Sequence, residues 1–350
     1  MTQRLRCGLI TLEPPEGGLI TPIVEGFTDN GCDVQVLYRH SEWELRTCDF
    51  LVTYGPMQSM AWAVVRLSQS TRLPPLVVWF TEQVPSPRPN LAIYLAARAR
   101  YLCEEFAHRH AMATWMLEKI GFSVLPRKAG RLRILGEMLT LESRRLLKLI
   151  CVFTDTNSLF LRHYGLPVAV VPMGYHPQFG ERLGDLERDV DVVFLGSTRD
   201  KRRRDIIFEL DKKLRAKGLS FVVKDGSPER GCVFGKERTL LLNRSKIALN
   251  IMRQPWDDPV FRLLLAAPTG AMLLSEKLLA TSTGPFQPGK HFAMSELRTI
   301  VEAIEYYLSN DDERRQIARE AFEFVTNELT MRNMTRRILV ALGLREAGAS

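Results

Sequence analysis

Apolar, strand-like runs alternate with helix-like segments along this chain in two successive series, and this feature constrains the fold most. The runs lie at 5–12, 33–38, 49–54, 75–81, 150–154 and 168–172 in the first series, and at 190–196, 219–223, 246–251 and 271–274 in the second. Strands separated by helices run parallel, because each helix carries the chain back across the sheet. The pattern therefore predicts two α/β domains, each a parallel sheet with helices on both faces.

The alternation breaks once, at a segment rich in glycine and proline over 171–180. We take this segment as the boundary between an N-terminal domain, 1–176, and a second domain, 188–326. The remaining residues, 327–350, are expected to form a last helix over 327–342. A chain of 350 residues has the length of two such domains.

The composition is that of a globular protein with a modest excess of positive charge. Hydrophobic residues make up 45% and charged residues 25%, and the net charge is +8. The excess is spread evenly, since residues 1–175 hold 19 basic and 15 acidic side chains. An even spread argues against a basic arm for nucleic acid and favours local sites for anions.

Cysteine usage and hydropathy predict a cytoplasmic protein. The six cysteines form no Cys-x-x-Cys pair, and they are typical of buried thiols in a reducing compartment. No apolar run approaches the roughly 18 residues of a membrane span. The basic helix expected over 131–149 leaves two interpretations open. It lies on an anionic membrane surface, or it packs its leucines on the sheet and leaves its charges in water.

The first loop of the second domain has the pattern of an anion site. Gly196 ends a strand and is followed by Ser197, Thr198 and Arg199, just before a helix begins. Free N–H groups at a helix start bind phosphate. The cations of Lys201–Arg204 oppose the helix dipole by about 0.3–1 kcal/mol each, and a bound diphosphate would reverse that penalty. The alternative is a solvated basic face that nearby aspartates partly neutralise.

A second loop, after the strand 246–251, gathers side chains suited to a nucleotide. It contains Arg253 and Trp256, and Arg262 follows on the next helix. An indole stacks on a base, and guanidiniums bind phosphate oxygens. The aspartates and proline at 257–259 are explained equally well as a helix cap.

These residues carry a resemblance to a known family. The stretch from Asn250 through Arg262 and Ala-Ala-Pro-Thr-Gly to Glu276, with the later run containing Gly289 and His291, resembles the donor half of GT-B glycosyltransferases. The nearest branch is the spore-maturation-like part of group 1. The resemblance covers 190–342 and is weaker over 1–180.

The weaker part of the resemblance concerns the acceptor side. Gly17 and Gly18 resemble the glycine-rich loop after the first strand, and His176 lies in a run that resembles the interdomain hinge. The family implies two Rossmann-like domains facing across a cleft, with the acceptor on the first, the nucleotide-sugar on the second, and the last helix crossing back. The implied donor-site residues are Gly196, Ser197, Thr198, Arg199, Asn250, Arg253, Trp256, Arg262, Glu276, Gly289 and His291.

The chain departs from this family at one carboxylate. Related retaining enzymes carry two glutamates with seven residues between them, and these positions are Asp257 and Leu265 here. Arg262 matches the arginine that precedes the second glutamate by three in the spore-maturation-like branch. Glu276, in the next loop, is the candidate to replace the missing ribose ligand. The departure keeps a second hypothesis open, namely a non-catalytic GT-B-like protein that binds a nucleotide or glycan or acts as a scaffold.

The predicted function is transfer of a sugar from a nucleoside diphosphate to a glycan, lipid-linked or protein hydroxyl. Glu82, just beyond the strand 75–81, is the candidate base, and Asp257 is the remaining carboxylate of the pair. A capping or surface role explains Glu82 equally well. We expect no metal and no cofactor besides the sugar donor, since Asp189-Val-Asp191 precedes a strand rather than following one.

Overall fold

The computed structural model describes residues 4–11, 18–38, 46–54, 73–109, 127–184, 186–279 and 285–346. The chain separates into two compact units. Unit 1 consists of Met1–Pro172 with Thr335–Ser350, and unit 2 consists of Met173–Met334. Gly17 and the segments expected to be helical over 57–71 and 110–120 lie outside the described residues.

Unit 1 is built on a parallel sheet of six strands. The strands are β1 (Leu5–Thr11), β2 (Cys32–Tyr38), β3 (Phe50–Tyr54), β4 (Leu76–Trp79), β5 (Leu147–Val152) and β6 (Val168–Val170), in the order β2-β1-β3-β4-β5-β6. Every described pair is parallel. All residues of β3 and β4 are buried, as expected of strands that helices cover on both faces.

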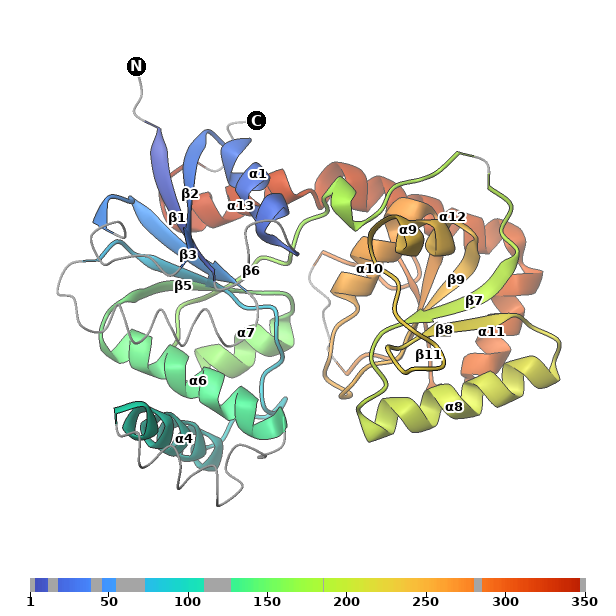
Figure 1. Ribbon diagram of the computed structural model, residues 1–350, viewed down its shortest axis with the longest axis horizontal. Helices are drawn as coiled ribbons and strands as arrows, with labels where there is room; N and C mark the ends of the chain where they lie inside the picture. The colour runs from blue at the N-terminus through green and yellow to red at the C-terminus, as the bar shows by residue number, and fades with distance from the viewer. Residues whose placement is uncertain are drawn as a thin grey trace. The chain divides into compact units, whose positions relative to one another are not determined.

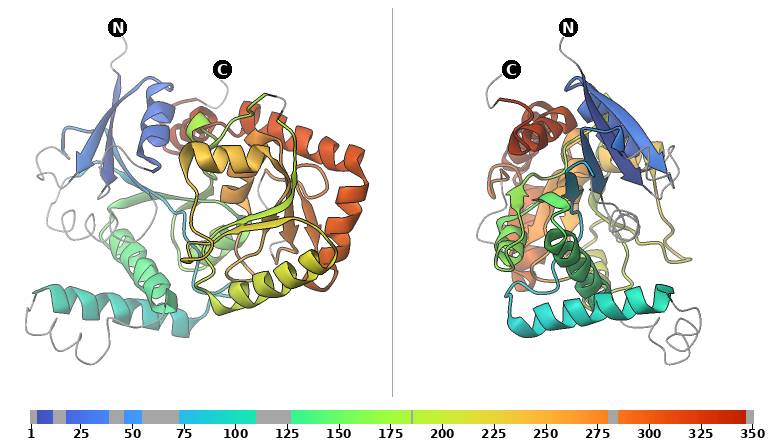
Figure 2. Two further views of the ribbon diagram at one scale, coloured as in Figure 1. Left: turned by 45° about the vertical axis from the view of Figure 1, so that its right-hand side comes forward. Right: turned by 90° about the vertical axis from the view of Figure 1, so that its left-hand side faces the viewer.

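Helices of unit 1 form layers around this sheet. They are α1 (Ile20–Thr28), α4 (Leu91–Arg109), α6 (Arg127–Ser143), α7 (Asp155–Arg162) and the later part of α13 (Met331–Ala341). The views in Figures 1 and 2 show α4 outside α6, on the side away from the sheet. Thr335 of α13 donates to Gly26 O at 2.7 Å and accepts from the Asn30 amide at 3.0 Å, which fastens α13 to α1.

The basic helix is shorter than the sequence predicted. Arg145 turns the chain with φ 57°, and β5 then begins at Leu147, where the prediction had placed the helix until 149. The leucines of this stretch fit both the 3.6-residue period of a helix and the two-residue period of a strand. Leu147 and Leu149 are buried and Lys148 between them is exposed, which is the alternation of a strand. Residues 134–141 are all buried, so this part of α6 offers no face to a membrane. Within the described ranges, no helix is long and apolar enough to cross a bilayer.

Unit 2 is built on a second parallel sheet, of five strands. These are β7 (Val190–Leu195), β8 (Phe221–Lys224), β9 (Ser245–Asn250), β10 (Met272–Glu276) and β11 (Ala293–Ser295), in the order β11-β10-β9-β7-β8. The sequence did not predict β11, whose three residues give no periodic pattern. The hydrophobic core of unit 2 packs these strands against the helices Lys201–Ala216 (α8), Ile300–Ser309 (α11) and Asp311–Glu323 (α12). Phe194, Ile207 and Ile304 are among its buried residues.

The helices of unit 2 alternate with its strands. They are α8 (Lys201–Ala216), α9 (Gly235–Asn243), α10 (Val260–Ala266), α11 (Ile300–Ser309) and α12 (Asp311–Glu323). Short turns of 3₁₀-helix lie at Pro177–Phe179, Ala267–Thr269 and Leu297–Thr299, and a π-helical turn spans Phe324–Glu328. Figure 1 shows α8 and α11 on one side of the sheet and α9 and α10 on the other.

The entry to unit 2 pairs with its exit. Tyr175 N donates to Leu329 O at 2.6 Å, and Met331 N donates to Tyr175 O at 2.8 Å. A Cβ on Gly174 would lie 2.4 Å from the Cα of Met331, so glycine allows this close approach. Because of this pairing, unit 2 starts at Met173, whereas the sequence placed its start at 188, and the last helix begins at Met331 instead of 327.

Candidate functional site

The sheet of unit 2 has a topological switch point between β7 and β9. From β7 the chain moves to β8 on one side, and β9 lies on the other side of β7. Ligands of open α/β sheets bind at such a point, beyond the carboxyl ends of the strands. Gly196 follows β7 and Asn250 ends β9, so the two sequence-predicted loops meet at this edge.

Arg262 reaches from α10 to both strand ends. Its Nε donates to Leu195 O at 3.3 Å and its Nη1 to the side-chain oxygen of buried Asn250 at 2.7 Å. A Cβ on Gly196, where φ is +149°, would come within 2.7 Å of Arg262 Nη2. A glycine is therefore required for the guanidinium to lie against the backbone here.

Arg203 approaches the same place from the first turn of α8. Its side chain donates through Nη1 to Ser197 O at 3.2 Å, the residue is only 3% exposed, and its Nε has no hydrogen-bond partner. The guanidinium carbons of Arg203 and Arg262 lie 5.8 and 5.4 Å from the ring centre of Phe194. Two guanidiniums thus share one aromatic ring at the switch point.

In the described part of the chain neither cation forms a direct ion pair, although the negative charge of Asp257 partly opposes the lowering of both pKa values. Among the described residues, no Asp or Glu oxygen comes within 4.0 Å of either guanidinium. Burial, and after it the charge of Arg262, lower the pKa of Arg203 to about 9. Burial also lowers the pKa of Arg262. An anion bound between the two side chains would reverse both shifts, since it favours the charged forms.

Other polar groups of the loop after β7 already form hydrogen bonds within the protein, which the sequence did not predict. Thr198 Oγ1 donates to Asp225 Oδ2 at 2.9 Å, and Ser197 Oγ accepts from Arg199 N at 3.3 Å. Arg199 is exposed. Asp200 caps α8 by accepting from Arg203 N at 3.3 Å. The hydroxyl of Thr198 is therefore already engaged, whereas the hydrogen-bonding capacity of Arg203 is not exhausted.

The cationic run Lys201–Arg204 divides into two inward and two outward side chains. Lys201 pairs with Asp205 at 2.5 Å, and Arg204 is exposed beside the same carboxylate. Arg202 turns inward like Arg203, but it forms a two-pronged pair with Glu276. The solvated-face interpretation thus holds for half of the run.

Glu276 is not free to replace the missing ribose carboxylate. It accepts from Arg202 at 3.1 and 2.5 Å and from Met252 N at 2.5 Å, and it is 3% exposed. These hydrogen bonds hold β10 to α8 and to the loop after β9. Leu265, at the position where relatives carry the glutamate, is half-buried.

The loop between β9 and α10 carries the other predicted residues. Asp257 Oδ2 lies 3.4 Å from Arg253 N and 3.5 Å from Arg253 Nε, and Trp256 beside them is half-buried. Asp258 accepts from Val260 N at 3.0 Å, which is the helix-start role that the sequence left open. Burial and the charge of Asp257 raise the pKa of Asp258 to about 7.

Two residues implied by the resemblance, Gly289 and His291, lie in the segment that leads to β11. Gly289 is a turn glycine with φ +79° and has open space around it. His291 is buried, stacks on Phe324 at a centroid distance of 4.2 Å, and accepts from Gln287 N at 3.2 Å through Nδ1. Burial lowers the pKa of His291. These contacts stabilise the fold of the loop between β10 and β11.

The acceptor-side residues Gly18, His176 and Glu82 lie in turns or beyond the end of a strand. Gly18 has φ 66° in the turn before α1, and His176 caps the turn Pro177–Phe179 through a bond from Gln178 N to Nδ1 at 3.2 Å. Glu82 is half-buried and lies beyond the carboxyl end of β4. The sequence did not single out its neighbour Gln83, which is 2% exposed and whose amide nitrogen and oxygen make no hydrogen bond.

No metal-binding cluster is formed in the described parts of the chain. There, three or more His, Cys, Asp or Glu side chains do not gather in a way that could hold an ion.

Comparison with known proteins places the chain in one fold class. Residues 192–340 match the family model described as glycosyl transferase-like. HepE from Anabaena, solved with UDP and glucose, has a TM-score of 0.57 at 10% identity, over 97% of this chain and 100% of that one. No curated protein matches.

Two further structures are similar over nearly the whole chain. Sucrose-phosphate synthase from Thermosynechococcus elongatus has a TM-score of 0.58 at 11% identity, covering 96% of this chain and 97% of that one. WaaG, a glycosyltransferase involved in lipopolysaccharide biosynthesis, has a TM-score of 0.54 at 13% identity, covering 97% and 100%. The two parallel-sheet units therefore have the GT-B fold, as the sequence predicted.

Proposed function

We propose that the protein is a glycosyltransferase that moves a sugar from a nucleoside diphosphate to an acceptor hydroxyl. The observation that carries this proposal is the pair Arg203 and Arg262 at the switch point of unit 2, two guanidiniums that form no ion pair with a carboxylate in the described part of the chain. A diphosphate supplies the missing charge. The glycosyl transferase-like family model over this unit and the UDP in the similar HepE structure support the same donor class.

The reaction assigns a role to these cations. The bond between the anomeric carbon and the β-phosphate oxygen breaks, and the acceptor oxygen forms a new bond to that carbon. Arg203 and Arg262 stabilise the negative charge that develops on the departing diphosphate. In this proposal the guanidiniums neutralise the leaving group, so turnover persists in the presence of a metal chelator.

The acceptor proton needs a destination. We propose Glu82 as the group that receives it or positions the hydroxyl, because Glu82 is half-buried at the carboxyl edge of the unit 1 sheet. Glu82→Gln keeps the shape and removes the charge. If Glu82 is the base, turnover falls by about 10²–10⁴-fold while donor affinity stays the same. Unchanged rates at both limiting and saturating acceptor would remove Glu82 from the site.

Activity itself is tested with purified protein and a panel of nucleotide-sugars. We expect release of nucleoside diphosphate with one donor, by transfer or by slow hydrolysis. Arg262→Ala should lower the rate about tenfold or more, since a charge-assisted hydrogen bond contributes about 1.5–3 kcal/mol. Arg204→Ala is the matched control, because Arg204 is on the same turn as Arg203 and points outward. Failure of every donor would contradict the enzyme proposal.

A second function is favoured by one observation, the loss of a free ribose carboxylate. Leu265 replaces it, and Glu276 is held by Arg202 and Met252. A protein that binds nucleotides without transferring sugar would have the same cations. Leu265→Glu discriminates the two, with Leu265→Gln as control. In an enzyme that binds its donor in the usual pose, Leu265→Glu tightens the binding of a nucleoside diphosphate but not that of inorganic pyrophosphate. If the donor pocket is remodelled, Leu265→Glu changes the affinities for the two ligands by the same factor.

We also propose that the protein belongs to the spore-maturation-like branch of group 1 and works in the cytoplasm. Arg262, three residues before Leu265, supports the spore-maturation-like branch. All six cysteines are unpaired, and Cys7, Cys32, Cys48 and Cys151 are buried, which supports a reducing compartment such as the cytoplasm.

A further inference from the structure

A second cationic site lies at the opposite edge of the unit 2 sheet. A cavity of about 680 Å³ opens beside the amino ends of the strands, where Arg188 precedes β7, Lys246 is the second residue of β9 and Gly270 precedes β10. The switch point with Arg203 and Arg262 is at the carboxyl ends of the same parallel strands. Strands of five or six residues separate the two edges by about 15–20 Å, at roughly 3.3 Å per residue. The two sites are therefore distinct.

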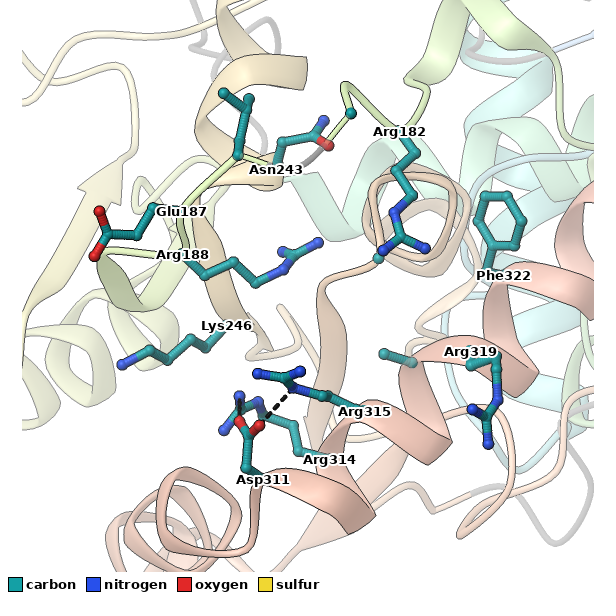
Figure 3. A pocket seen from close by; sticks show the side chains of 14 residues that line it. Arg182, Glu187, Arg188, Asn243, Lys246, Asp311, Arg314, Arg315, Arg319 and Phe322 are labelled. Atoms are coloured by element: carbon teal, nitrogen blue, oxygen red, sulfur yellow. Dashed lines mark hydrogen bonds and ion pairs between the residues drawn. The ribbon is translucent and has the colours of Figure 1, made fainter.

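The lining of this cavity is strongly positive. Its six basic residues are Arg182, Arg188, Lys246, Arg314, Arg315 and Arg319, and its acidic residues are Glu187 and Asp311. Figure 3 shows the guanidiniums of Arg182, Arg188 and Arg315 directed into a common space, while Lys246 and Arg319 point away from it. Three forks converging on one volume match the geometry of phosphate oxygens.

The acidic groups nearby neutralise only part of this charge. Arg314 and Arg315 share the single carboxylate of Asp311, with Arg315 Nε at 2.5 Å. In the part of the chain that the structure describes, no carboxylate pairs with Arg182 or Arg188. Unpaired guanidiniums thus remain at the centre of the cavity.

Arg188 is an anchored component of the site. It donates to Leu242 O at 3.3 Å, to Thr269 O at 2.7 Å and to Ser245 O, so backbone carbonyls hold the guanidinium in place. A Cβ on Gly270 would lie 2.8 Å from Arg188 Nη2, so the glycine leaves room for it. Burial and the charges of Arg182, Arg314 and Arg315 lower the pKa of Arg188 to about 10.

We propose that this cavity binds a ligand through its phosphate groups, as a site separate from the donor site. The volume is within the roughly 300–1,000 Å³ of small-molecule pockets. Arg188 is a half-buried cation that donates to neutral carbonyls and has further cations around it, and the lining carboxylates Glu187 and Asp311 form no ion pair with it, so a bound anion stabilises it. A soluble phosphorylated compound and a phospholipid headgroup present the same chemistry to these arginines.

The test measures binding of inorganic pyrophosphate by calorimetry, in protein that already carries Arg262→Ala to weaken the donor site. Arg182→Glu with Arg315→Glu should weaken pyrophosphate binding about tenfold or more. Lys212→Glu with Lys213→Glu, two exposed positions on α8 outside the lining, is the control with the same change of charge. Equal affinity in the two double variants would overturn the proposal.

Two additional outcomes are decisive. If Arg262→Ala alone binds no pyrophosphate, the proposal of a second site is overturned, whereas the proposal of the donor site stands. Arg182→Ala removes a side chain without an ion pair, so it tests the site even if the double variant does not fold. Weaker binding in Arg182→Ala supports the proposal, and unchanged binding contradicts it.

Vesicles distinguish the two sources of phosphate. Sedimentation with phosphatidylcholine vesicles containing phosphatidylglycerol, lost in Arg182→Glu with Arg315→Glu and competed by pyrophosphate, would identify a headgroup. Pyrophosphate binding without sedimentation would identify a soluble ligand. Absence of both would contradict the proposal.

Discussion

Arg203 is a buried cation beside a second cation, Arg262. Burying this charge lowers the stability of the ligand-free protein, and the same charge stabilises a bound diphosphate. We predict that Arg203→Met raises the melting temperature in the absence of ligand, because an apolar side chain of similar length replaces a desolvated charge. The same change should weaken nucleoside diphosphate binding about tenfold or more. Thermal unfolding and calorimetry measure the two effects. A variant that is both less stable and unchanged in binding would contradict the assignment.

Asp258 gives the stability of unit 2 a pH dependence of known sign. In the unfolded chain an aspartate titrates near pH 4, whereas burial and Asp257 raise the pKa of Asp258 to about 7. Between these values the folded protein binds more protons than the unfolded chain, so stability falls as the pH rises from about 4 to about 7.

The isosteric variant isolates this contribution. Asp258→Asn should remove the fall and exceed the wild type at pH 8 by about 1–3 kcal/mol in free energy of unfolding. Urea unfolding at pH 5 and pH 8 measures the difference, with Asp205→Asn as an exposed control. Parallel pH profiles for wild type and Asp258→Asn would show that Asp258 is not the group responsible.

Single residues were predicted from the sequence where their chemistry is local. Gly196 follows β7, Asn250 ends β9 and Arg262 lies on the helix after β9, so parallel topology brings the two loops to one edge. The direction of a side chain was not predictable. Nothing in the run Lys201–Arg204 shows that Arg202 reaches Glu276, 74 residues later, or that Arg203 is buried. The surroundings of His291 were not predictable for the same reason, because its stacking partner Phe324 is distant in sequence.

Among the elements, the crossing of α4 and α6 depends on one glycine. A Cβ on Gly136 would lie 2.3 Å from Ala97 O and 2.8 Å from Tyr101 Cβ. Gly136→Ala therefore forces the two helices apart, although alanine favours helix locally. We predict a loss of about 1–3 kcal/mol, visible as a lower melting temperature of unit 1. Gly136→Ser should be at least as damaging, and a stabilised Gly136→Ala variant would contradict the close packing.

Strands were the most predictable elements. Those buried on both faces are short apolar runs bounded by polar turns, and nine of the ten described runs that the sequence singled out match their strands within two residues at the start. The exception is β5, where an apolar stretch fits helix and strand until packing decides. The β11 strand was missed because three residues contain too little pattern.

The last helix, α13, brings the end of the chain back into unit 1. Thr335 of α13 bonds to Gly26 O and to the Asn30 amide, and both Thr335 and Asn30 are buried. Thr335→Val preserves the shape and removes the hydroxyl, which should cost about 1–3 kcal/mol through the polar groups left without a partner. Chemical unfolding followed in unit 1 measures this loss. Thr299→Val, at an exposed position in unit 2, should leave that transition in place, and equal effects would contradict the role of α13 in unit 1.

The central claim is that Arg203 and Arg262 form the diphosphate site of a sugar-donor pocket. Its most direct test is calorimetric titration of a panel of nucleoside diphosphates into wild type, Arg262→Ala and the outward-facing control Arg204→Ala. We predict that one nucleoside diphosphate binds wild type and Arg204→Ala alike and binds Arg262→Ala about tenfold or more weakly. Equal affinity in all three proteins, with the folds intact, would contradict the claim.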